Sequence, residues 1–257
     1  MKILIAFVIA MLTCTTSCLA ESFASVDALY GSATVTDKSG QSSDVSLGQE
    51  ISEGQTIKTA SDGEVHLVTL DGGMIALRPN TEFRVDEYTA EGGSADRILM
   101  TLVKGTLRSI TGWIGKHNPS AYALQTYNST IGIRGTDHET TVILQDGADG
   151  AGTYDTVIEG ATVLKTANGS TNITPGKFAF AQQGKTEAPR LLTKAPKYWA
   201  VRSLKIEDRI QQRKEFLRER LERMREDRIT QIKSEKTAHP ERLHERHEHA
   251  RRMEHRL

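Results

Sequence analysis

The stretch EVHLVTLDGGMIAL, residues 64–77, decides the fold class of this chain. Apolar or β-branched residues alternate with polar ones before Asp-Gly-Gly, and a short apolar run follows it, which is typical of two strands joined by a tight turn. Similar short runs recur at 82–85, 99–103 and 140–144, with glycine-rich turns between them. The pattern predicts a mainly β domain with no helical period.

A weak repeat runs through this β region. Its unit is a short strand that turns at a glycine, and it occurs at 47–59, 103–107, 158–163 and 174–177. Repeated short strands suit a stack in which each unit buries the inner face of its neighbour. We therefore expect a solenoid-like stack, and the alternative is a β-sandwich, because a sandwich produces the same pattern.

The N-terminus is predicted to be a secretory signal peptide covering residues 1–20. Lys2 precedes an apolar run at 3–12, and small residues lead up to Ala20, which is the layout of such a peptide. The run is shorter than the roughly 20 residues that cross a bilayer, so no transmembrane helix is expected in the mature chain. We expect a periplasmic or otherwise exported protein; the alternative is a lipoprotein anchored through Cys18.

Charge is distributed unevenly along the chain. The formal net charge is +0, yet residues 194–257 hold 19 Lys and Arg against 12 Asp and Glu, a net of +7 that leaves −7 on the remainder. After a linker at 189–200, good helix formers dominate, so residues 201–257 are predicted to form a separate basic helical tail. Its narrow apolar stripe, from Ile206 to Met224, needs a surface: the β domain, a second copy or the envelope.

Several segments follow one another in an order that is found in a known family. They are the segments 31–35, 47–48, 54–59, 70–83, 103–108 and, most specific, 126–136, which reads TYNSTIGIRGT. Together they resemble the FecR domain of bacterial envelope proteins, and a FecR-like β domain is expected at 26–188. The sequence departs from the family at Ser129 or Thr130, where Ala is frequent, and at His138, near a position that is usually apolar.

The resemblance implies an exported β domain that binds or senses and is not an enzyme. The best-known members regulate iron-uptake sigma factors and carry a cytoplasmic domain and a membrane helix, an architecture that is not expected here. We expect a binding or structural module of the envelope whose basic tail docks to anionic surfaces or partners. The alternative is an envelope signal-sensing component that contacts a membrane partner through the β domain. Nucleic acid is not an expected partner, and the tail offers a route to oligomers.

The densest polar cluster of the β region is Arg134-Gly135-Thr136-Asp137-His138. One interpretation makes it a ligand-contact loop. The other is architectural: Gly135 permits a turn, and the five donors of Arg134 bridge neighbouring strands. The sequence contains no nucleophile elbow, zincin motif or P-loop, so neither an enzyme nor a cofactor is expected.

The last nineteen residues contain five histidines. On a helix, His244 and Glu248 would lie on one face, and with His247 and His249 they form a candidate zinc or nickel site. The alternative is a solvated face, because the neighbouring arginines repel a cation. The same histidines would add positive charge to the tail on acidification.

Overall fold

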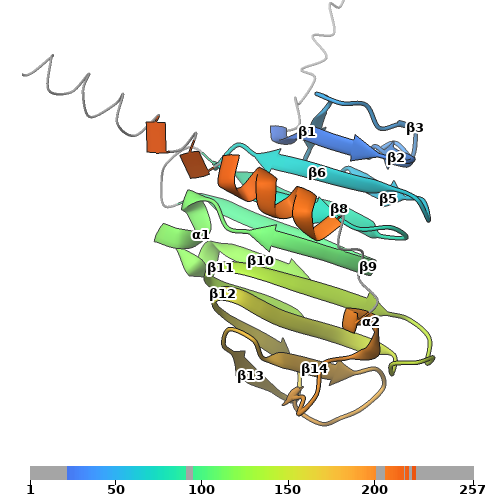
Figure 1. Cartoon of the computed structure of the whole chain (residues 1–257), viewed down its shortest axis with the longest axis vertical. Coiled ribbons are helices and arrows are strands. Elements are labelled where there is room, and N and C mark those ends of the chain that lie inside the picture. The colour runs from blue at the N-terminus through green and yellow to red at the C-terminus, as the bar shows by residue number, and fades with distance from the viewer. Residues whose placement is uncertain (1–21, 91–94, 201–205, 217, 220–221, 224–257) are drawn as a thin grey trace, which may run out of the picture.

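The computed structural model describes residues 22–90, 95–200, 206–216, 218–219 and 222–223, and Figure 1 shows them as a twisted sheet with few helices. The sheet has 15 strands, which confirms the mainly β prediction. The strands are β1 (Ser22–Tyr30), β2 (Ala33–Thr36), β3 (Ser42–Asp44), β4 (Glu50–Ser52), β5 (Thr56–Thr59), β6 (Glu64–Thr69), β7 (Met74–Leu77), β8 (Glu82–Thr89), β9 (Arg97–Ile110), β10 (Tyr122–Gln125), β11 (Thr130–Ile143), β12 (Gly152–Thr166), β13 (Gly169–Ile173), β14 (Phe178–Gln182) and β15 (Arg190–Leu191). The helical elements are α1 (Trp113–His117), the 3-10 turn η1 (Pro119–Ala121), α2 (Lys197–Ala200) and a helix at 206–216.

Three long strands carry the sheet through two layers. The second halves of β9 and β11 and the first half of β12 pair in the layer that also holds β4, β1, β6, β7, β14 and β15. Their other halves pair in the layer that holds β3, β2, β5, β8, β10 and β13. One continuous sheet therefore folds over on itself.

A glycine lies at the bend of each long strand. Gly105 in β9, Gly135 in β11 and Gly160 in β12 have φ angles of 88°, 60° and 81°. L side chains rarely adopt these angles, so glycine lets each strand turn without leaving the sheet.

The hydrophobic core lies between the two layers. Phe23 of β1 meets two rings of β8 across the interior, with ring centroids 6.4 Å from Phe83 and 5.1 Å from Tyr88. Ile57, Met100, Leu124 and Leu164 belong to the same buried set. Packing of the two layers face to face fixes which residues of β9, β11 and β12 point inward and which point outward.

The predicted solenoid-like stack is not what the structure shows. Among the strand pairs of the described residues, only β9 and β10 run parallel, and α1 and η1 form the crossover that this pair requires. The glycines interpreted as corners of repeated rungs instead end hairpins or bend long strands. The packing is nearer to the sandwich alternative, with one sheet running through both layers.

The helix at 206–216, called here the covering helix, lies across one outer face of the sheet (Figure 1). Ile206 and Ile210 are buried against Met74 and Ala76 of β7. These residues belong to the tail predicted at 201–257, and of the three surfaces considered for its apolar stripe, Ile206 and Ile210 contact the β domain. β7 can receive them because its alternate residues present apolar side chains outward as well as inward. The predicted signal peptide at 1–20 and residues 224–257 lie outside the described residues.

Candidate binding site

The outer face under the covering helix carries an unusual set of buried charges. We call it the charged face, and it consists of Asp27, Glu64, Arg78, Arg108, Asp137, Glu139 and Glu159. Most of these side chains are almost fully buried, and Glu159 lies at the exposed edge. Buried charges persist in a fold when they are paired, so the arrangement of partners defines the site.

Two arginines form the centre of the charged face. Arg108 of β9 makes two parallel hydrogen bonds to Asp137 of β11, each of 2.8 Å. Arg78, which follows β7, donates from Nε to Glu139 over 3.1 Å. Asp137 and Glu139 are two residues apart on β11, so their side chains emerge on the same face of the sheet.

The covering helix completes these pairs. Glu207 accepts hydrogen bonds from both Arg78 and Arg108 and so links the two arginines. Lys214, two turns further along the helix, lies 2.8 Å from Asp137 and 2.6 Å from Glu159. Both ends of the helix therefore contact members of the ion pairs within the sheet, Glu207 at the two arginines and Lys214 at Asp137.

Two more helix arginines extend the contact to β1 and β6. Arg209 pairs with Glu64 and lies over the Tyr30 ring, 3.9 Å from its centroid. Arg213 pairs with Asp27. Three cations of the predicted basic tail thus contact carboxylates of the domain itself.

The pairing outweighs the effect of burial on the titrating groups. Burial alone would raise the pKa of Asp137 above its ordinary 3.8, but Arg108 and Lys214 lower it. Burial alone would likewise lower the pKa of Arg78, but Glu139 and Glu207 raise it. Asp137 and Arg78 are therefore charged at neutral pH.

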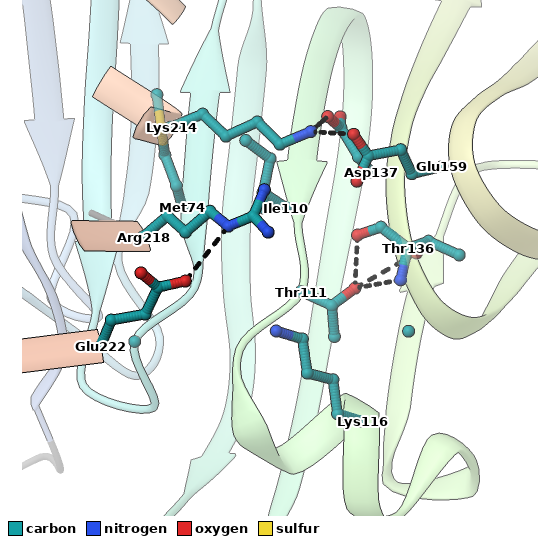
Figure 2. A pocket seen from close by; sticks show the side chains of 12 residues that line it. Met74, Ile110, Thr111, Lys116, Thr136, Asp137, Glu159, Lys214, Arg218 and Glu222 are labelled. Atoms are coloured by element: carbon teal, nitrogen blue, oxygen red, sulfur yellow. Dashed lines mark hydrogen bonds and ion pairs between the residues drawn. The ribbon is translucent and has the colours of Figure 1, made fainter. Parts of the chain in front are cut away.

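A cavity of about 420 Å³ opens beside the covering helix. Figure 2 shows its charged rim, where Lys214 reaches Asp137 and Glu159 and where Lys116 of α1 extends from the opposite side. Thr111 and Thr136 line its wall and hydrogen-bond to one another, since Thr136 N–H donates to Thr111 Oγ1 over 3.0 Å. The cavity borders the charged face at the bend of β11.

The structure divides the predicted cluster at 134–138 between three locations. Gly135, Thr136 and Asp137 line the cavity. Arg134 is exposed, and the bridging of strands expected from it is carried out by Arg78 and Arg108. Its position explains the difference, because Arg134 precedes the bend and points away from the charged face.

His138 lies on the inner side of β11 and is fully buried. Its Nδ1 is 3.0 Å from Asp155 Oδ1, and Thr140 and Thr162 also donate to that carboxylate. Its Nε2 has no hydrogen-bond partner among the described residues. The residue that departs from the family pattern is thus held inside the domain by a polar pair.

The candidate metal ligands His244, His247, Glu248 and His249 lie outside the described residues. Within the described part of the chain, no group of three metal-binding side chains comes together. A search of the same residues finds no helix with the length and hydropathy to span a membrane.

Sequence reasoning missed most of the charged face. Arg78 and Arg108 lie in the segments 70–83 and 103–108, whose only signal in the sequence is the resemblance to the family, and Lys214 is one of many tail cations. The sequence did carry one signal for Arg78 and Arg108, which is that each lies in or just after an apolar run. An arginine in such a place is expected to pair with a carboxylate if it is buried. The assembled site holds charged groups of the covering helix.

Acid is expected to weaken the fold through Asp137. Its lowered pKa means that its contribution to stability is complete above about pH 4 and is lost as the pH falls through the folded-state value. The free energy of unfolding, measured with urea at pH 7 and pH 3, should therefore fall less in Asp137→Asn than in the natural chain. An equal fall in both proteins would contradict this role for Asp137.

Comparison with known proteins now adds the family. Residues 55–163 match the family described as FecR protein, and no curated protein matches the chain. Among solved structures, a candidate anti-sigma factor from Parabacteroides distasonis aligns at 12% identity with a TM-score of 0.44, and the alignment covers 56% of this chain and 62% of that one. A cell surface anchoring domain aligns at 27% identity with a TM-score of 0.24 and covers 24% of this chain and 82% of that one. The resemblance predicted from the sequence is confirmed: residues 55–163 of this chain carry a FecR-like domain.

Proposed function

We propose that this chain is an envelope signal-sensing component that recognises a protein partner through the charged face of its FecR-like domain. The family match supports the domain type and its association with the envelope. The observation that carries the proposal is that the charged face already holds a protein segment, the covering helix, through ion pairs at both of its ends. Such a surface suits recognition of a charged polypeptide.

Partner capture from an envelope extract tests this role. Glu159→Arg places a cation at the exposed edge of the charged face, where Glu159 now meets Lys214. Asp44→Arg makes the same change on exposed β3 in the other layer and is the matched control. We expect to find proteins that bind to the natural chain and to Asp44→Arg but do not bind to Glu159→Arg. Identical sets from all three would contradict recognition through this face.

Export is the second element of the proposal. We expect the signal peptide to be removed after Ala20, because small residues precede that bond in the three-part pattern. Intact-mass measurement of the mature protein should then place Glu21 at the N-terminus. An acylated Cys18 would contradict cleavage after Ala20 and support the lipoprotein alternative. A retained Met1 would contradict export by cleavage.

A further inference from the structure

We propose that the charged face is a docking surface for a basic amphipathic helix of another protein, and that the covering helix occupies this surface in the free chain. The inference rests on the proposed function and specifies the charge and the sequence pattern of the partner. It follows from three features of the contact: its small apolar part, its net charge and its register.

The apolar part of the contact is small. Only Ile206 and Ile210 of the covering helix belong to the buried apolar cluster, opposite Met74 and Ala76. Val68 and Ile110 pack beside this cluster, and the other contacts are the stacking of Arg209 on Tyr30 and the ion pairs, in which the side chains of Arg209 and Arg213 are 29% and 26% exposed. Pairs that water and salt reach are screened, so the helix is held by contacts that a competing segment could replace.

The net charge of the face selects the occupant. Without the covering helix, the face has five carboxylates, those of Asp27, Glu64, Asp137, Glu139 and Glu159, against the two arginines Arg78 and Arg108. An acidic face repels anionic lipid and nucleic acid. It attracts a basic segment, and its width is already matched to one helix.

The register of the face selects the sequence pattern. The two arginines donate to one acid, Glu207. The carboxylates around them pair with cations two, six and seven positions after Glu207, at Arg209, Arg213 and Lys214. The apolar anchors lie one position before the acid and three after it. We therefore expect a partner helix with this order: an apolar residue, an acid, then arginines and lysines separated by a second apolar residue.

A labelled peptide with the sequence of residues 204–219 serves as the probe, because it carries this pattern. Its binding to the purified full chain is followed by fluorescence anisotropy. Ile210→Asp in the full chain puts a charge into the apolar contact and loosens the covering helix, so the free face is populated more often. The peptide should bind this variant at least about tenfold more tightly than the natural chain. The matched control, Gln211→Asp, changes the charge equally at an exposed position and should bind as the natural chain does.

A charge exchange tests the register. A peptide with Arg213→Asp should lose affinity for the Ile210→Asp chain, and a chain that also carries Asp27→Arg should recover it, because Arg213 meets Asp27. Circular dichroism confirms that each chain is folded. If the Ile210→Asp chain is unfolded, the full chain with Arg213→Asp replaces it in the assay, because that substitution loosens the covering helix at its contact with Asp27.

Three results would overturn the inference. They are equal peptide binding by Ile210→Asp and Gln211→Asp, equal binding of a scrambled peptide, and a dimer of the natural chain in sedimentation, which would make a second copy the occupant. The assay uses purified components only. Its failure therefore leaves the comparison of Glu159→Arg with Asp44→Arg in an envelope extract as a separate test of the proposed function.

Discussion

Replacement of Arg78 by methionine is expected to lower the free energy of unfolding by about 3–5 kcal/mol, the cost of leaving one member of a buried ion pair without its partner. Glu139, which is 1% exposed, would lose the guanidinium that now donates hydrogen bonds to it in the interior. Glu207 would lose one of its two arginines. Urea unfolding at pH 7 measures the change.

Arg84→Met is the matched control for this prediction. Arg84 also pairs with a carboxylate, that of Asp86, but its side chain is 48% exposed. Exposed pairs contribute about 0–1 kcal/mol, so this variant should unfold nearly as the natural chain does. Equal losses in Arg78→Met and Arg84→Met would mean that burial of the pair is not what stabilises this region.

A second substitution distinguishes the effect of losing the arginine from the effect of keeping the Glu139 carboxylate buried. Adding Glu139→Leu to Arg78→Met removes the buried carboxylate as well and fills the site with an apolar side chain. The double variant should therefore recover part of the lost stability. A double variant less stable than Arg78→Met would show that the cost came from lost packing of the arginine stem.

The strands of this domain were predictable because their pattern is local. Alternation in residues 64–77 led directly to the β6–β7 hairpin, which the structure confirms. The course of the long strands was not predictable in this way. A glycine such as Gly160 marks a turn in the sequence equally well at a hairpin and at a bend in one continuous strand, and only pairing with distant strands decides between them.

The candidate site shows the same division between local and distant information. The cluster at 134–138 directed attention to β11, and three of its residues do line the cavity. The groups that pair with Asp137 come from β9 and from the covering helix, 29 and 77 positions away along the chain. Charge pairs between distant segments leave no spacing to recognise, because any of the 33 basic residues could have been the partner.

Substitution of Gly160 by alanine is expected to lower the free energy of unfolding by about 3 kcal/mol. Its φ of 81° is costly for any L side chain, and an added Cβ would lie 2.4 Å from the carbonyl oxygen of Gly135. Backbone strain and overpacking each cost about 1–3 kcal/mol, and neither is relieved here, because the obstructing atom belongs to the backbone of the paired strand.

Gly132→Ala on β11 is the matched control for this bend, because a Cβ there would meet no atom within 4 Å. Its unfolding free energy should change by about 0.5 kcal/mol or less, as for other substitutions without strain or clash. Urea unfolding compares the two variants. Equal effects would show that β12 relaxes at residue 160 without cost. A loss confined to Gly160→Ala would mean that the paired bends of β11 and β12 hold the strands in both layers, and with them Asp137 and Glu159 in register beneath the covering helix.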